Sequence, residues 1–173
     1  MNHKNQDAVI VFNNDRLSEN QLSDANKSRV QKAVDLYNER QVKNIIFVGK
    51  DVQLFAAYAK ESGLDEGVIT SSPNEEDIVK ALYDLRTTIL DKRKYKKVVF
   101  VTTSNHFSVT KFASNKIFGP TFETDFELAV SGLRGLPYDY AMKSEAEVMS
   151  KLMSTLEKVK EGSLEDLEKL LGK

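Results

Sequence analysis

The chain has 173 residues, a length typical of a single domain, and it contains no cysteine. Its 25 basic and 26 acidic side chains give a net charge of −1, which excludes bulk attraction to nucleic acid or to an anionic membrane. The lack of cysteine excludes disulfides, thiol nucleophiles and cysteine-type zinc sites, and it fits a reducing compartment. No apolar segment is long enough for a signal peptide or a membrane span, so we expect a cytoplasmic protein without membrane or nucleic-acid partners.

Short apolar runs of strand length recur along the chain. Runs at 8–12, 45–48 and 98–101 do not alternate with polar residues. Such β-branched runs are typical of strands buried on both faces of a parallel sheet. A shorter strand is predicted at 68–70, and the alternating pattern at 124–131 predicts a more exposed edge strand.

Apolar residues at helical spacing fill the intervals between these runs. Val148, Leu152, Leu156 and Val159 mark a long C-terminal helix, and a leucine-rich segment follows at 164–171 that can pair with a second copy in a homo-oligomer. The alternation of strands and helices predicts a Rossmann-like, doubly wound α/β fold. We expect one domain with a mainly parallel five-stranded sheet and helices on both faces.

A ligand site is expected at the carboxyl ends of the strands, because open α/β sheets bind their ligands there. Polar residues follow each apolar run directly. The candidate ligand-binding residues are Asn13, Asn14 and Asp15 after the first run, Gly49 and Lys50 after the second, Asn74 and Asp77 after the third, and Thr102, Thr103, Ser104 and Asn105 after the fourth.

The segment after the fourth run is the most suggestive. Ser104 or Asn105 is expected to cap the next helix, with His106 in its first turn. The helix dipole disfavours an imidazolium there, so a neutral His106 can accept a proton or donate a hydrogen bond to a ligand. An ordinary helix cap, with His106 filling space, fits the same residues equally well.

Other ligand motifs are absent or weak. Asn13 and Asn14 stand where a dinucleotide-binding turn needs glycines, and Gly49 lacks the rest of a phosphate-binding loop. Asp15, Asp51 and the acidic residues at 75–77 offer oxygen ligands to Mg²⁺, but no spacing among them indicates a metal site. Acidic residues such as these are more typical of the first turn of a helix.

Two basic features allow a structural and a functional reading. The basic run at 92–97 follows a helix and precedes a strand, so we expect a solvated helix end on the side of the sheet opposite the ligand site. Arg29, early in the first long helix, can reach an anionic ligand or form a surface ion pair.

The order of these motifs resembles the YdcF/SanA/ElyC-like family, a bacterial family of unknown function. The resemblance runs from about residue 7 to residue 119. It is carried by the sequence at 7–13, by Ser28, Arg29 and Val30, by the run at 43–49, by Ser71, Glu76 and Asp77, and by Val101, Thr102, Thr103 and His106.

The chain departs from the family pattern at several positions. Asn13 and Asn14 replace glycines, Gly49 keeps one glycine of a pair, Asn74 replaces a threonine, Asp77 replaces an asparagine and Val109 replaces an arginine, whereas Glu76 and His106 match. The family resemblance implies a Rossmann-like fold with a small-molecule pocket. One member resembles an S-adenosylmethionine binder, and others are membrane-anchored proteins of envelope-precursor metabolism. Loss of the arginine removes a planar anion clamp.

Two functions remain open on the sequence. One is an enzyme acting on a nucleotide-like or phosphorylated metabolite, with His106 or Glu76 as acid–base group and S-adenosylmethionine as the cofactor suggested by the resemblance. The other is a non-catalytic ligand sensor or protein-interaction module that has lost the family's activity.

Overall fold

The computed structural model describes residues 5–13, 21–40, 42–73, 77–129 and 138–173, and the side chains of these residues apart from 13 and 138–144. At its centre lies a five-stranded parallel sheet with the strand order β3-β2-β1-β4-β5. The predicted Rossmann-like α/β fold is therefore confirmed. The strands are β1 (Ala8–Asn13), β2 (Asn44–Gly49), β3 (Ile69–Pro73), β4 (Lys97–Thr102) and β5 (Glu123–Leu128).

The central strands are buried on both sides, which explains their continuous apolar runs. In β1, the side chains of Ala8, Ile10 and Phe12 belong to one apolar core, and those of Val9 and Val11 belong to the other. A strand in the middle of a parallel sheet meets helices on both faces, so neither set of alternating residues reaches water.

The two edge strands differ in length from the prediction. β3 continues beyond residue 70 to Pro73, and β5 ends at Leu128 rather than at residue 131. Ser71 and Ser72 belong to β3 because they pair with Phe47 and Val48 of the neighbouring strand. The residue at which each strand ends depends on its backbone pairing with the neighbouring strand, and the pattern of hydrophobic residues does not reveal that pairing.

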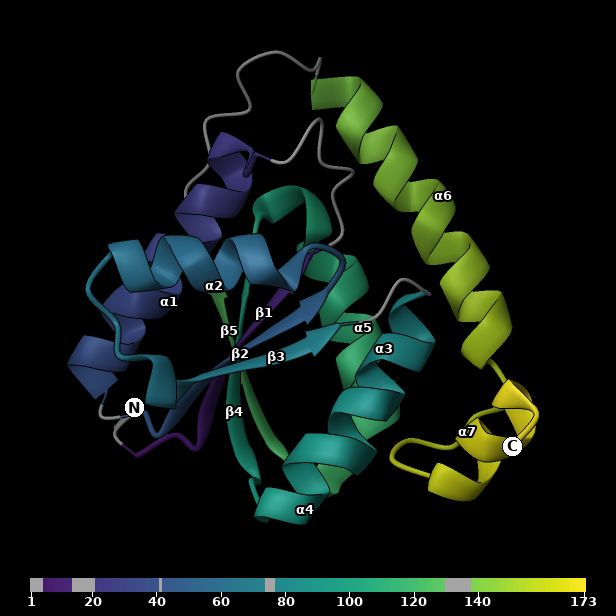
Figure 1. Ribbon diagram of the computed structural model, residues 1–173. Helices are drawn as coiled ribbons and strands as arrows, with labels where there is room; N and C mark the ends of the chain where they lie inside the picture. Colours follow the sequence, from purple (N-terminus) through teal and green to yellow (C-terminus); the bar gives the residue numbers. More distant parts are fainter. Residues whose placement is uncertain (1–4, 14–20, 41, 74–76, 130–137) are drawn as a thin grey trace.

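Helices cover both faces of the sheet (Figure 1). The Val9 face carries α1 and α2, and the Ile10 face carries α3 and α5, with α6 and α7 outside them. No helix in the described part of the chain is long and apolar enough to cross a membrane. The helices are α1 (Asp24–Arg40), α2 (Val52–Glu61), α3 (Ile78–Leu85), α4 (Asp91–Arg93), α5 (Phe107–Phe118), α6 (Tyr138–Leu156) and α7 (Leu164–Leu171), with short turns η1 (Glu66–Val68), η2 (Arg86–Leu90), η3 (Ser104–His106) and η4 (Gly119–Thr121).

Three of the C-terminal leucines pack against the chain's own core. Leu167 is fully buried, and Leu164 and Leu171 pack against the same core as α3 and α5. Tyr83 on α3 donates a hydrogen bond of 3.0 Å to Glu168 on α7. Leu170 is 42% exposed, and the pairing of two copies through this segment stays a prediction.

A close approach of two glycines holds the turn between α6 and α7. Gly119 has φ +62°, and a Cβ built on it would lie 2.6 Å from Cα of Gly162. The N–H of Gly162 donates to the carbonyl of Lys116 at 2.8 Å. Arg86 donates a hydrogen bond of 2.9 Å to the carbonyl of Gly162 and another to the carbonyl of Ile117. These contacts fix α6 and α7 to the end of α5.

Asp7 anchors the amino-terminal side of the sheet. Its carboxylate accepts hydrogen bonds from the backbone N–H groups of Lys96 (2.8 Å) and Lys97 (3.0 Å) and from the ammonium of Lys43 (2.7 Å). Partial burial alone would raise the pKa of Asp7, but the hydrogen bonds from Lys43 and from the two backbone groups outweigh it, and the pKa is lowered.

We predict that Gly119→Ala lowers the free energy of unfolding by about 2 kcal/mol or more, since left-handed strain and a steric clash add together. Gly63→Ala is the control, because Gly63 has φ +96° but nothing within 4 Å of a built Cβ. Urea unfolding measures both variants. Equal losses in the two variants would show that the contact with Gly162 is unimportant.

We predict that Asp7→Asn lowers the free energy of unfolding at pH 7 by about 1–3 kcal/mol, because two backbone N–H groups lose a charged acceptor. Since the folded pKa of Asp7 lies below its unfolded value, the wild-type advantage is complete above about pH 4 and shrinks as the pH falls through the folded pKa. Urea unfolding at a series of pH values measures this.

Lys43→Ala separates the ion pair from the backbone hydrogen bonds. The side chain of Lys43 is 64% exposed, so its loss should lower the free energy of unfolding by clearly less than Asp7→Asn does. A larger loss for Lys43→Ala than for Asp7→Asn would contradict the anchoring role of the backbone hydrogen bonds.

Candidate functional site

The carboxyl ends of β1 and β4 form the topological switch point of the sheet. From β1 the chain proceeds outward to β2 and β3, and then returns to the other side of β1 to form β4. Helices that start beyond two such strands diverge over opposite faces, and ligands of α/β proteins bind in the space between them. Here α1 follows β1 on one face and α5 follows β4 on the other.

Arg29 ties three elements together at this point. Its side chain is 1% exposed, and its guanidinium donates to the carbonyl of Phe12 (3.4 Å), to Oδ1 of Asn26 (3.0 Å) and to Oγ1 of Thr103 (2.8 Å). These acceptors belong to the end of β1, to α1 and to the end of β4. Because it is buried, the guanidinium is not part of a surface ion pair. The other reading of Arg29, that it reaches an anionic ligand, stays a prediction.

The hydrogen-bond chain continues from Thr103 to Asn105. Because the Thr103 hydroxyl accepts from Arg29, its own hydrogen is directed to Oδ1 of Asn105, at 2.7 Å. With its side-chain oxygen engaged in this way, Asn105 has the two N–H groups of its amide as donors for other partners. The network therefore orients a hydrogen-bond donor at the strand ends.

The start of α5 differs from the prediction. Residues 104–106 form the 3₁₀ turn η3, α5 begins at Phe107, and His106 occupies the N-cap position without capping through its side chain. Neither Ser104 nor Asn105 is the N-cap of α5. The reason is the backbone bond from the N–H of His106 to the carbonyl of Thr103 (2.9 Å), which tightens the segment before the helix begins. His106 is nonetheless close to the switch point, as expected.

At the ends of β2 and β3 the described residues show two left-handed backbone positions and a helix cap. Gly49, the last residue of β2, has a backbone φ of +114°. Asp51, the N-cap residue of α2, has a left-handed backbone conformation with a φ of +52°. Lys50 between them is exposed. Asp77 caps α3, since its carboxylate accepts from the N–H of Lys80 at 3.0 Å, so this candidate ligand-binding residue has a structural role.

Several predicted site residues cannot be placed against this geometry. Asn13 ends β1, but its side chain is not described. The other predicted positions fall outside the described residues: Asn14, Asp15, Asn74 and Glu76. Thr102 is buried, and its hydroxyl makes only a 3.5 Å contact with the carbonyl of Thr103, so Thr103 is the better-connected hydroxyl of the pair.

Val109 packs in the apolar core where the family pattern has an arginine. It is 3% exposed and belongs to the same apolar cluster as Ile10 and Phe12. The position is therefore occupied by a core residue, and it supplies no cation to a ligand.

Two buried polar residues near the carboxyl end of the sheet were not predicted from the sequence. Asn26 is fully buried, and among the described residues its Nδ2 has no hydrogen-bond acceptor. Glu145 on α6 is 8% exposed, and its Oε1 has no donor in the same part of the chain. Their spacing offered a signal: Asn26 lies three residues before Arg29, and Glu145 lies seven before Leu152, on the inner faces of their helices.

The described residues contain no group of three or more aspartate, glutamate or histidine side chains that could hold a metal ion. The donor that the described part of the site offers is the Asn105 amide, whose oxygen is engaged by Thr103, because the backbone N–H groups of His106 and Phe107 are bonded to the carbonyls of Thr103 and Ser104. Donors of this kind suit an anion. Comparison with known proteins gives no match to a family model, to a curated protein or to a solved structure.

We predict that Thr103→Val lowers the free energy of unfolding by about 2 kcal/mol, because a buried guanidinium loses an acceptor. Thr102→Val is the matched control: it is the adjacent buried threonine, and its hydroxyl has only the 3.5 Å contact. Thr102→Val should lower the free energy of unfolding by less than about 1 kcal/mol. Urea unfolding compares the two variants, and equal losses would argue against a structural bond between Arg29 and Thr103.

Proposed function

We propose that this chain binds a small anionic metabolite, of nucleotide-like or phosphorylated type, at the carboxyl ends of β1 and β4. The observation that carries the proposal is the hydrogen-bond chain from Arg29 through Thr103 to Asn105. It supports ligand binding because it orients the Asn105 amide at the switch point of the sheet.

Catalysis at this site is a further step. His106 adjoins the network and is only partly buried, so a ligand held by Asn105 lies within its reach. In the enzymatic form of the proposal, His106 exchanges a proton with the ligand. Glu76 keeps its proposed acid–base role on the strength of the family resemblance. S-adenosylmethionine, which that resemblance suggests, carries a carboxylate that the same donors can bind.

A non-catalytic sensor is the competing proposal. It is favoured by Val109, which fills the core at the position where the family pattern has an anion-binding arginine. Such a protein binds its ligand without turnover. A cytoplasmic location, the lack of nucleic-acid partners, pairing through the C-terminal helices and membership of the YdcF/SanA/ElyC-like family likewise remain proposals from the sequence.

A thermal-shift screen tests the binding proposal. The compounds are inorganic phosphate, ribose 5-phosphate, AMP, S-adenosylmethionine, a sugar nucleotide and a polyprenyl phosphate analogue, each with and without Mg²⁺. A compound present at about 100 times its dissociation constant adds roughly 2.7 kcal/mol of stability. We predict that at least one compound binds. Asn105→Ala should lower the affinity for that compound about tenfold, equivalent to about 1.4 kcal/mol of binding free energy.

Asn115→Ala is the matched control, since Asn115 is exposed near the far end of α5, whereas Asn105 lies in η3 before the start of that helix. It should leave the affinity unchanged. His106→Ala then separates the two functions: loss of turnover supports the enzyme, whereas a bound compound that is never converted supports the sensor. A screen without any hit, or a hit indifferent to Asn105→Ala, would refute binding at this site.

A further inference from the structure

Glu145 is a buried acid on α6. It is 8% exposed, and in the described part of the chain its Oε1 has no hydrogen-bond donor. Gln6, Arg40 and Arg86 also have an unsatisfied atom but are held by hydrogen bonds through another atom, whereas the single hydroxyl of Thr110 is likewise unsatisfied among the described residues. Leaving a carboxylate oxygen buried and unpaired costs stability. A group that costs stability in the empty protein is commonly retained for a ligand.

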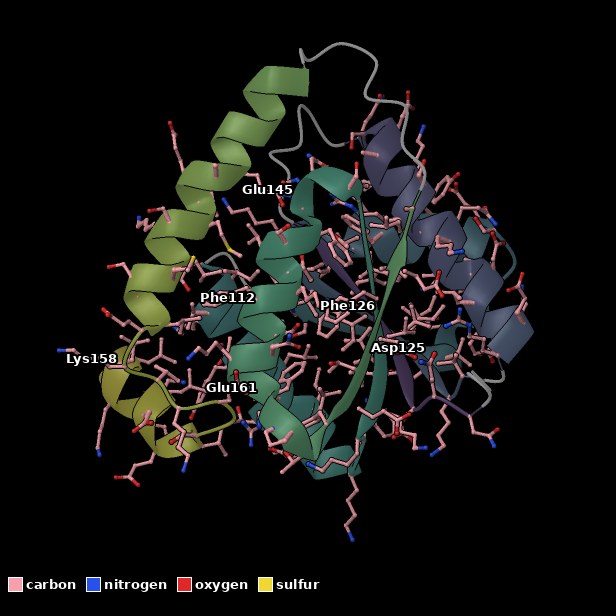
Figure 2. The ribbon with its side chains drawn as sticks, turned by 180° about the vertical axis from the view of Figure 1, so that it is seen from behind. Phe112, Asp125, Phe126, Glu145, Lys158 and Glu161 are labelled. Atoms are coloured by element: carbon pink, nitrogen blue, oxygen red, sulfur yellow. The ribbon has the colours of Figure 1, made fainter. Side chains whose placement is uncertain are left out.

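The position of Glu145 relates it to the strand ends. The α6 helix contacts both α5 and η3, and Figure 2 shows Glu145 where α6 passes the amino-terminal end of α5. Leu152 and Leu156, farther along the same helix, are buried in the apolar core. The inner side of α6 thus changes from leucine to carboxylate at the level of η3, the turn that contains Asn105 and His106.

We propose that Glu145 is a ligand-binding residue, which accepts a hydrogen bond from a hydroxyl group of the ligand held at the ends of β1 and β4. This inference rests on the proposed function. An ionised carboxylate only accepts hydrogen bonds and repels a second anion, so the ligand's phosphate lies toward the Asn105 amide. Its hydroxyl group lies toward α6.

The ligand class follows from this division. A site with donors on one side and a carboxylate on the other suits a phosphate ester that carries free hydroxyl groups. Sugar phosphates and nucleotides both meet this description, since each combines a phosphate with a sugar. Ribose 5-phosphate and AMP represent the two sources, and inorganic phosphate represents the anion alone.

The first measurement needs no ligand. Glu145→Met keeps the side-chain length and removes the unpaired oxygen, so the melting temperature of the ligand-free protein should rise by about 2–4 °C. Glu147→Met is the matched control, because Glu147 is exposed on the same helix, and it should leave the melting temperature unchanged. A lower melting temperature for Glu145→Met would mean that the acid has an internal structural role, and would overturn the inference.

The second measurement is calorimetric titration of the wild type and both variants with the three probes. Glu145→Met should lower the affinity for ribose 5-phosphate or AMP, whichever the wild type binds, about tenfold or more. The affinity for inorganic phosphate should stay equal or rise. Whichever of ribose 5-phosphate and AMP binds more tightly identifies the ligand as a sugar phosphate or a nucleotide. Equal affinity of wild type and Glu145→Met for the ester would overturn the role of Glu145 but leave the proposed function intact. No binding of any probe to the wild type would overturn both.

Discussion

The buried guanidinium of Arg29 is the constraint on which the site end of the fold depends. A charge removed from water must be met by hydrogen-bond acceptors, and Arg29 draws them from α1, from the end of β1 and from the end of β4. The same bonds that satisfy the cation fix where α1 lies relative to two strand ends. They also determine the direction of the Thr103 hydroxyl and thus of Asn105, so the stability of this corner and the orientation of its donor have one origin.

The two ends of the sheet differ in their chemistry. At the amino-terminal end, charges are paired: Lys43 with Asp7, Lys96 with Asp91 and Lys97 with Glu123. Two lysines of the basic run at 92–97, Lys96 and Lys97, are therefore paired with neighbouring acids. At the carboxyl end, the described polar side chains instead form the network of Arg29, Thr103 and Asn105. Ion pairs thus hold one end of the sheet, and the proposed ligand site lies at the other.

The C-terminal helices connect packing with the site. The approach of Gly119 to Gly162, reinforced by Arg86, fixes the turn that follows α6, and Leu156 and Leu152 bury the same helix against the core. With its far end held in this way, α6 passes the start of α5 and brings Glu145 there (Figure 2). The proposed hydroxyl-binding acid thus depends on packing about three helical turns away from it.

The sequence by itself determined the α/β class, the buried strands and the end of the sheet where polar residues gather, because hydrophobic periodicity and strand order are local or nearly local properties. Only the tertiary structure decided the rest. Arg29 became a buried tie rather than a surface cation because Thr103, a residue 74 positions away, came within 2.8 Å of it. Asp77 became a helix cap, three of the C-terminal leucines joined the chain's own core, and Glu145 reached the start of α5. Each of these outcomes depends on which distant partner a side chain meets, and spacing along the chain does not encode that partner.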